Sequence, residues 1–220
     1  MFTPQLYFLA GLGFDERIFS NLQLENCHIN YINWLEPETN ETLENYVIRM
    51  SQQIPQNDNP IILIGHSFGG IIIQQISKFL KAEKVIIISS IKSKEEMPIT
   101  LKFFKYVPLY KYFNKKLILK SFPVWARAFG YNSEKGRNLF VHMISNCTDN
   151  YFKWAMDKIV NWNGNDNSNK IIHIHGTRDK TFPIKRIKDP IIIPDGSHFM
   201  VFSKAEEVSE VLNKVIKTIS

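Results

Sequence analysis

The chain has 220 residues, enough for one well-buried domain with an insertion but few for two independent domains. Its apolar content of 44% and charged content of 22% are typical of a globular protein and exclude a disordered or fibrous one. No apolar run is long enough to span a bilayer. The early apolar run 6–10 has no Lys or Arg before it and predicts a core strand rather than a secretion signal, so we expect a cytoplasmic protein.

The net charge of +6 belongs to one segment of the chain. Residues 94–158 hold 12 of the 27 Lys and Arg and 5 of the 21 Asp and Glu, a balance of +7 that leaves −1 for the remainder. No helix-turn-helix, zinc-finger or RNA-binding pattern accompanies this excess, so we expect no nucleic-acid partner. The two cysteines, Cys27 and Cys147, stand in no ligand spacing, which predicts buried thiols and no metal site.

The first ninety residues alternate between strand patterns and helix patterns. Such alternation is typical of a parallel sheet with right-handed crossovers. A glycine-rich loop follows the first strand, and Asp15 can cap a short helical turn after it. The expected strands are 5–9, 26–33, 61–64 and 84–89, and the expected helices are 41–53 and 68–80.

The alternation stops between residues 94 and 161, where the sequence predicts only helices. Ser133 and Thr148 are good N-caps for the two longest of them. Strands are expected again at 170–175 and 190–193, before a closing amphipathic helix at 203–219. The pattern predicts one α/β domain, residues 1–92 and 170–220, with a helical cap, residues 93–169, inserted into it. The shorter helices of this insertion are expected at 100–106, 109–119 and 124–129.

The stretch 65–70 reads GHSFGG and stands between an apolar strand and a long apolar helix pattern. A Gly-x-Ser-x-Gly in this context is a sharp turn that lifts the serine clear of the strand. Gly65 and Gly69 supply the lack of side-chain bulk that the turn requires, and Gly70 lets the helix pack close to the sheet. The context predicts Ser67 as a nucleophile.

A serine nucleophile needs a base within hydrogen-bond reach. His198 follows the last strand, at the carboxyl edge of the sheet where Ser67 also projects, and is the best candidate. His175 is interpreted instead as a hydrogen-bonded histidine at a strand end. The remaining four lie on the turn, on strands or in the insertion and are His28, His66, His142 and His173.

The base in turn needs an orienting carboxylate. Asp179 follows the fifth strand, again at the carboxyl edge, and is favoured. Asp195 is only three residues from His198 and is expected to belong to the turn, whereas Asp189 precedes its strand and lies at the opposite edge. The chain order is then nucleophile, acid, base.

With these motifs the chain resembles the α/β-hydrolase family over nearly its whole length. The matching stretches are 65–70, His175 to Asp179 and Gly196 to His198, and the insertion falls where that family keeps its lid. The resemblance implies a doubly wound, mainly parallel sheet of about six strands in the order 2-1-3-4-5-6, without the family's N-terminal hairpin. It also implies an oxyanion hole formed by the backbone N–H groups of Leu12 and Phe68, although Ala10-Gly11 stands where the family often has His-Gly.

The resemblance implies a serine hydrolase that acts on a small carboxylic ester or thioester through an acyl-enzyme. No cofactor and no metal are expected. Members of the family also use such a triad for carbon–carbon cleavage or elimination, and others keep the fold to bind a small ligand, so both alternatives remain open.

The predicted insertion combines aromatic and basic residues and has no Asp or Glu from Leu101 to Ser133. In one interpretation the aromatic residues pack this segment onto the sheet and the basic residues are solvated. In the other interpretation the aromatic residues line an acyl pocket, and the basic residues form a rim that attracts an anionic small-molecule substrate or touches a membrane surface. We do not favour the membrane contact from the sequence. The residues are Lys102, Lys105, Lys111, Lys115, Lys116, Lys120 and Arg127, and Phe103, Phe104, Tyr106, Tyr110, Tyr112, Phe113, Phe122, Trp125, Phe129 and Tyr131.

Overall fold

The computed structural model describes residues 3–55, 59–112, 114–164 and 171–218. Six strands within these residues form one sheet in the order β2-β1-β3-β4-β5-β6, and all neighbours are parallel. This confirms the predicted doubly wound sheet and its strand order. The strands are β1 (Gln5–Leu9), β2 (His28–Tyr31), β3 (Ile61–His66), β4 (Lys84–Ile88), β5 (Ile171–Gly176) and β6 (Ile191–Ile193).

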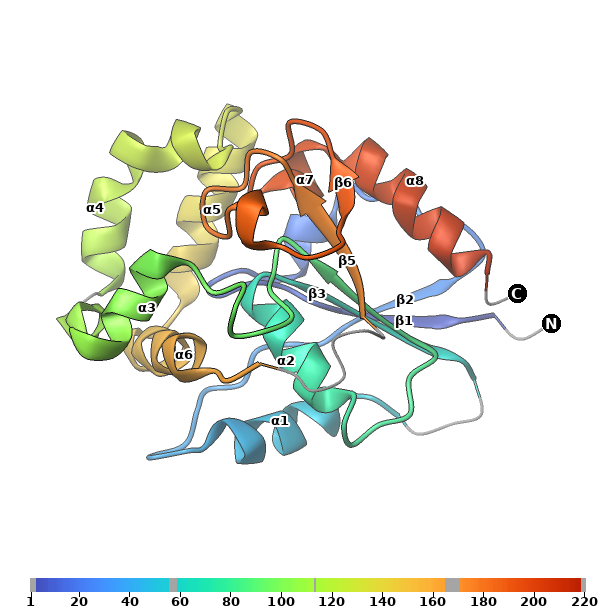
Figure 1. The fold of residues 1–220 in the computed structure, drawn as a ribbon, viewed down its shortest axis with the longest axis horizontal. Helices are drawn as coiled ribbons and strands as arrows, with labels where there is room; N and C mark the ends of the chain where they lie inside the picture. Colours follow the sequence, from blue (N-terminus) through green and yellow to red (C-terminus); the bar gives the residue numbers. More distant parts are fainter. Residues whose placement is uncertain (1–2, 56–58, 113, 165–170, 219–220) are drawn as a thin grey trace.

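Helices cover both faces of the sheet (Figure 1). Successive side chains of a strand point to opposite faces, so Leu6 and Phe8 pack with Leu212 of α8 (Ala205–Ile216) on one side. Tyr7 and Leu9 pack on the other side with α1 (Leu43–Ser51) and α2 (Phe68–Ile76). Because both faces are buried, the inner strands read as continuous apolar runs rather than as alternating ones.

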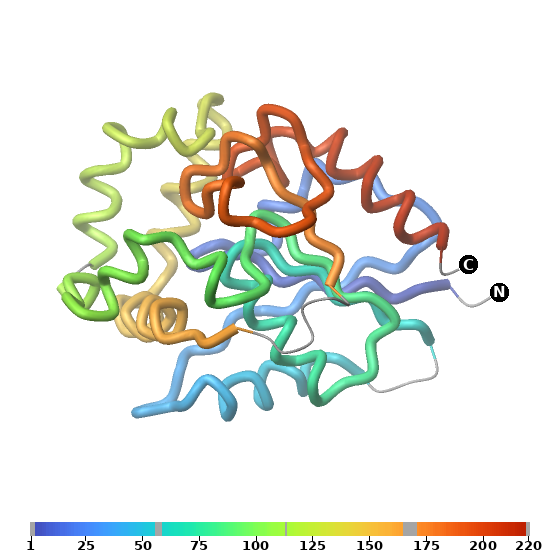
Figure 2. Tube along the Cα trace, viewed as in Figure 1, coloured from blue at the N-terminus to red at the C-terminus, as the bar shows by residue number. Residues whose placement is uncertain are grey.

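Four α-helices of the described residues lie between β4 and β5 and gather beyond the carboxyl ends of the strands (Figures 1 and 2). We call them the inserted helices. Ser133 and Thr148 cap two of them as predicted, since their hydroxyls accept hydrogen bonds from the N–H groups of Gly136 and Tyr151. The division into a catalytic domain and a cap stays a prediction, and its second boundary, 169/170, falls outside the described residues. The inserted helices are α3 (Ile99–Tyr106), α4 (Lys115–Trp125), α5 (Glu134–Asn146) and α6 (Asp149–Asn161).

Several predicted boundaries were wrong, and the clearest differences lie in the insertion. The stretch expected as one helix at 109–119 is a 3₁₀ turn, η2 (Leu109–Tyr112), followed by α4, because the Asn114 side chain caps a new helix at the N–H of Leu117. Helix α4 then runs through Pro123, whose missing N–H costs only one bond in the last turn, and passes into the 3₁₀ turn η3 (Ala126–Phe129).

The closing helix also departs from the expected 203–219. It consists of a short α7 (Met200–Ser203) and the longer α8, because Lys204 between them leaves helical backbone angles at φ −131°. None of the helices in the described ranges is both long and apolar enough to cross a membrane.

Candidate active site

Ser67 stands at the junction of β3 and α2 with φ 53° and ψ −121°, outside the regions that residues with a side chain normally adopt. Strain of this kind costs on the order of 1–3 kcal/mol and is tolerated where the surroundings fix it. A Cβ at Gly65 would lie 2.5 Å from the carbonyl oxygen of Gly69, and one at Gly69 would collide with the carbonyl oxygen of Ala10. The turn therefore requires glycine at both flanking positions.

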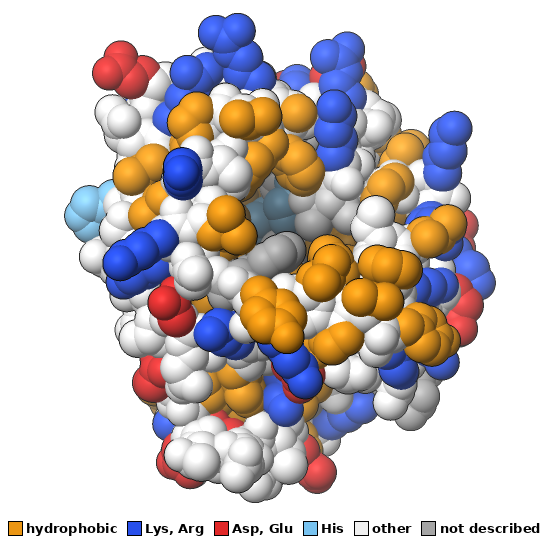
Figure 3. Space-filling model, turned by 90° about the vertical axis from the view of Figure 1, so that its left-hand side faces the viewer, with side chains coloured by type: hydrophobic (Ala, Val, Ile, Leu, Met, Phe, Trp, Pro, Cys, Tyr) orange, Lys and Arg blue, Asp and Glu red, His pale blue; other side chains and the backbone are white. Residues whose placement is uncertain are grey.

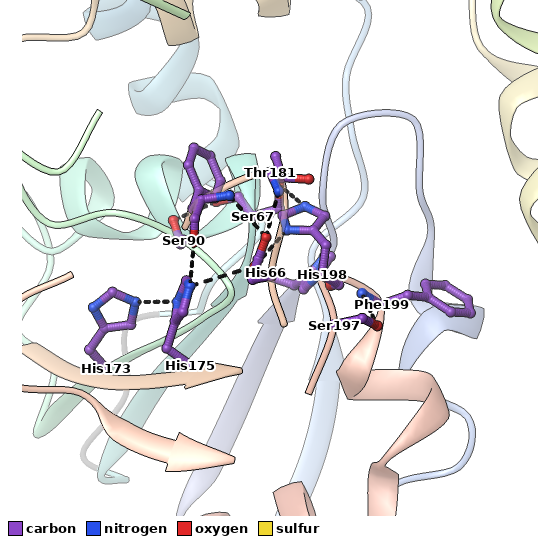
Figure 4. A network of polar contacts seen from close by, with 11 residues as sticks. His66, Ser67, Ser90, His173, His175, Thr181, Ser197, His198 and Phe199 are labelled. Carbon is purple, nitrogen blue, oxygen red and sulfur yellow. Dashed lines mark hydrogen bonds and ion pairs between the residues drawn. The ribbon is translucent and has the colours of Figure 1, made fainter. Parts of the chain in front are cut away.

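The structure brings Ser67, His198 and Asp179 together, although they lie far apart in sequence. Figure 4 shows Ser67 and His198 side by side. The distance from Ser67 Oγ to His198 Nε2 is 3.0 Å, and that from His198 Nδ1 to Asp179 Oδ2 is 2.9 Å. All three residues are buried. Each follows the carboxyl end of a parallel strand, β3, β5 or β6, and these ends meet at one edge of the sheet.

Asp179 is held as a carboxylate. Its Oδ1 accepts hydrogen bonds from the N–H groups of Thr181, at 2.8 Å, and Phe182, at 2.9 Å. Burial by itself would raise the pKa of Asp179, but the adjacent His198 and these hydrogen bonds outweigh it and hold the pKa below its usual value. An ionised carboxylate only accepts, so Nδ1 of His198 carries the proton and Nε2 presents its lone pair to the Ser67 hydroxyl.

The competing carboxylates lie elsewhere. Asp195 is exposed in a turn, with φ 57°, and its Oδ1 pairs with Nε of Arg178 at 2.8 Å. Asp189 is exposed just before β6, at the opposite edge of the sheet. Neither forms the contact to His198 that Asp179 forms.

His175 is buried at the end of β5, as the sequence indicated, but it belongs to a longer chain of contacts. Its Nε2 donates to the carbonyl oxygen of Phe182 at 2.7 Å, and its Nδ1 lies 3.1 Å from Nε2 of His173 (Figure 4). Burial lowers the pKa of both rings, to about 2 for His173. Both are neutral at physiological pH, and they support the loop whose N–H groups hold Asp179.

His66 and Ser90 form hydrogen bonds to His198 and Ser67, respectively, that the sequence did not reveal. His66 is buried, and its Nε2 donates to the main-chain carbonyl of His198 at 2.9 Å, so the elbow itself anchors the loop of the base. Burial lowers the pKa of His66 to about 3, which keeps the ring neutral. The hydroxyl of Ser90 donates to the carbonyl oxygen of Ser67 at 2.7 Å. The only feature of the sequence that pointed to the His66 contact is that this histidine directly precedes Ser67.

The two residues predicted for the oxyanion hole lie beside Ser67. Leu12 lines the same cavity as Ser67, and Phe68 is the first residue of α2, where helical N–H groups have no acceptor within the helix. Trp34 connects the two segments: its ring stacks on that of Phe68 with centroids 5.3 Å apart, and its Nε1 donates to the carbonyl oxygen of Gly11 at 3.2 Å. This link was not predictable from the sequence, because Trp34 lies in a loop after the edge strand.

An apolar cavity of about 540 Å³ opens over Ser67 and His198. A second cavity of about 350 Å³ reaches further between the inserted helices and shares part of its wall with the first, at Leu12, Trp125 and Met156. Together they have the size of sites that hold small organic ligands. The further walls of the first come from Leu101, Phe129, Tyr131, Ile159 and Phe182, and those of the second from Leu117, Ile118, Phe140, Ile144 and Phe152.

The aromatic residues of the insertion divide between both interpretations of the sequence. Phe122 and Tyr110 are buried packing residues, the first stacked on Phe140 at 4.1 Å and the second bonded to Asp157 Oδ1 at 2.8 Å. Trp125, Phe129 and Tyr131 line the cavity, and Tyr131 is also buried. Phe103, Tyr106 and Tyr112 are exposed, and Phe113 lies outside the described residues.

The described residues include no cluster of three or more His, Cys, Asp or Glu side chains that could hold a metal ion. Cys27 and Cys147 are half-buried free thiols rather than fully buried ones. Burial raises the pKa of both, to about 11 for Cys147, which makes them poor nucleophiles.

No protein of curated function matches the chain in sequence. Among solved structures, ClbQ from the colibactin NRPS/PKS pathway has a TM-score of 0.63 at 15% identity and covers 98% of both chains. A lipase-esterase related protein from Clostridium acetobutylicum has a TM-score of 0.66 at 17% identity, over 96% of this chain and 94% of its own. YbtT, a type II thioesterase from the yersiniabactin NRPS/PKS pathway, has a TM-score of 0.58 at 14% identity, over 98% and 92%.

At these identities the three structures show a shared fold. The family assignment comes from the sequence itself, since the model of the alpha/beta hydrolase family matches residues 8–211, nearly the whole chain. The matched range contains the elbow, both loops that meet it and all four inserted helices. The chain belongs to the alpha/beta hydrolase family.

Proposed function

We propose that this protein is a serine hydrolase that cleaves a small carboxylic ester or thioester through an acyl-enzyme intermediate. The observation that carries the proposal is the chain of hydrogen bonds from Asp179 through His198 to Ser67, which ends at the floor of an apolar cavity. A nucleophile, a base and an orienting acid in this order are the parts that acyl transfer requires.

In the first step Nε2 of His198 takes the proton of Ser67 while Oγ attacks the acyl carbonyl carbon. The N–H groups of Leu12 and Phe68 stabilise the oxyanion, and Trp34 fixes the two segments that carry them. The imidazolium then gives its proton to the departing alcohol or thiol, which leaves Ser67 acylated. A water molecule that gives a proton to His198 attacks the acyl carbon, and the proton returns to Oγ as the acid departs.

The apolar walls of the two cavities support an acyl group as the part of the substrate that they bind. Similar folds occur in a lipase-esterase related protein and in a type II thioesterase, and both support an ester or thioester as the bond cleaved. In this proposal residues 93–169 act as a cap that sets the size of the acyl site. The cytoplasmic location stays a prediction.

The test combines covalent labelling with a substrate series. A fluorophosphonate probe is expected to add one label to the wild-type protein, at Ser67, and none to Ser67→Ala. Hydrolysis of matched esters and thioesters of increasing acyl length then identifies the preferred bond and chain.

Each other outcome assigns a different function. An equally labelled Ser67→Ala variant would overturn the nucleophile. Labelling at Ser67 without turnover of any ester or thioester would favour a lyase or a carbon–carbon hydrolase. A burst of one acyl group followed by very slow release would favour a ligand-binding role.

A further inference from the structure

The inserted segment carries an exposed apolar surface, of which Leu117 also lines the second cavity. More than half of the exposed large apolar side chains in the described part of the chain lie between residues 99 and 124. Three of them are almost fully exposed, Tyr106 at 82%, Tyr112 at 80% and Val124 at 90%. We call this set the outer face; it consists of Ile99, Phe103, Tyr106, Val107, Leu109, Tyr112, Leu117 and Val124.

The outer face and the cavity wall are two sides of the same helices. On α3, Ile99, Phe103 and Tyr106 repeat at helical spacing and point outward, whereas Leu101 lines the cavity above Ser67. On α4, Val124 is exposed while its neighbour Trp125 lines both cavities. Figure 3 shows apolar side chains gathered around a hollow on this side of the molecule. The outer face thus lies on the same side of the molecule as this hollow (Figures 1 and 3).

The charge of the outer face has one sign. Between Leu101 and Ser133 the sequence contains no Asp or Glu, and lysines alternate with the exposed apolar residues. None of the ion pairs found among the described residues involves Lys105, Lys111, Lys116 or Lys120, all of which are exposed. Lys115 differs, since its ammonium group donates to the carbonyl oxygens at the end of α5.

We propose that the outer face docks the protein on an anionic lipid surface. Protruding aromatic and aliphatic side chains interleaved with lysines are the pattern of interfacial binding, because the apolar tips enter the acyl boundary while the ammonium groups stay at the headgroups. A protein partner fits less well, since lysine is depleted from the cores of protein interfaces. Docking in this orientation places the opening of the cavity against the lipid, from which an acyl substrate could enter directly.

The test measures binding of the Ser67→Ala protein to vesicles by sedimentation, at low and at high salt. Vesicles that contain phosphatidylglycerol are expected to bind the protein, and vesicles of phosphatidylcholine alone are expected to bind it far less. Because each lysine near an anionic surface contributes about 1 kcal/mol, removal of three is expected to weaken binding on the order of 100-fold. The charge variant is Lys105→Gln, Lys111→Gln and Lys116→Gln, and the apolar variant is Phe103→Ser, Tyr106→Ser and Tyr112→Ser.

Matched control variants change the same residue types on other surfaces and should bind as the parent does. The charge control is Lys78→Gln, Lys81→Gln and Lys214→Gln, and the apolar control is Ile48→Ser, Phe79→Ser and Ile192→Ser, all exposed.

Equal binding to both vesicle types, or equal loss in variants and controls, would overturn the proposal. The proposal would also be overturned if the protein did not bind vesicles but bound a purified acyl carrier protein, or formed a dimer that the apolar variant abolishes. Binding is read without turnover, and fluorophosphonate labelling of the wild type reports on the hydrolase separately. Failure of one proposal is therefore distinguishable from failure of the other.

Discussion

The sheet edge and the inserted helices differ in how far their functional and surface side chains are exposed. At the edge, Ser67, Asp179 and His198 are buried and hydrogen-bonded to one another, and the supporting histidines are neutral and enclosed. On the inserted helices, apolar and basic side chains face outward. In the two proposals made above, the chemistry depends on geometry fixed by the sheet, and recognition depends on the side chains that the insertion exposes.

One tight contact between the two regions lies beside His198. Gly130, with φ 96°, lies so close to Ser197 that a Cβ would collide with the Ser197 side chain, and the ring of Tyr131 lies 4.4 Å from that of Phe199. These contacts flank His198. The insertion therefore packs directly on the loop that carries His198, and the comparison can be tested from either side of this contact.

The largest effect is expected from Asp179→Asn, which keeps the shape of the site but removes the carboxylate that fixes the His198 tautomer. Loss of this control is expected to lower kcat by roughly 10⁴-fold. Steady-state kinetics on the preferred ester measures it. The matched control is Asp195→Asn, which should stay near wild type because Asp195 pairs with Arg178 on the surface; the reverse result would move the acid to the later loop.

A smaller effect, confined to long acyl chains, is expected from Ile118→Trp. Ile118 lines the second cavity but not the first, and a larger side chain there should exclude the end of a long acyl chain. Each methylene that loses its apolar wall costs about 0.8 kcal/mol, or about four-fold in kcat/KM. Rates on soluble esters of graded length should fall only beyond a threshold length. Val124→Trp is the control, because Val124 lies on the outside of the same helix, and this variant should leave the dependence on acyl length unchanged. If Ile118→Trp lowered the rate equally at all lengths, the second cavity would not hold the end of the chain.

Trp34→Phe tests the link between the two segments of the predicted oxyanion hole. The variant keeps an aromatic ring against Phe68 but removes the donor to Gly11, so kcat should fall by about five-fold to ten-fold with little change in KM. Trp154→Phe is the control, because the Trp154 ring also contacts Phe68 but its Nε1 donates to the carbonyl of Glu41 rather than to the segment that carries Leu12. If both variants lost the same stability and had the same kcat, the Trp34 bond would contribute to folding and not to the geometry of the oxyanion hole.

The buried histidines predict a change in stability that is absent at neutral pH and grows in acid. Free histidine titrates near 6.5, but burial lowers the pKa of His66 to about 3 and of His173 to about 2. Below 6.5 the unfolded chain binds protons that the folded one does not, so the free energy of unfolding falls by about 1.4 kcal/mol per pH unit for each ring.

Denaturant unfolding between pH 7 and pH 5 measures this slope. His173→Gln should reduce it by the contribution of one ring, whatever the variant does to stability at pH 7. His28→Gln, at an exposed position of β2, is the control for the substitution itself. An unchanged slope in His173→Gln would mean that this ring takes up a proton in the folded state.

Much of the site was predictable from the sequence because of one geometric rule. The carboxyl ends of parallel strands share an edge of the sheet, so the loops after β3, β5 and β6 had to meet. The rule predicted that Ser67, Asp179 and His198 would lie together, and the structure places them in one hydrogen-bonded chain. The strand order followed from the alternation of elements and the resemblance to the family.

What the sequence could not determine depends on contacts between distant segments. Trp34 and Ser90 look like ordinary loop residues until folding sets them against Phe68 and Ser67. The aromatic residues of the insertion look alike in the sequence, yet some are buried, some line the cavity and some are exposed. Helical periodicity gives the relative orientation of side chains on one helix, but only packing against the neighbouring helices decides which side turns inward. That choice, made by tertiary structure, separates the cavity wall from the outer face.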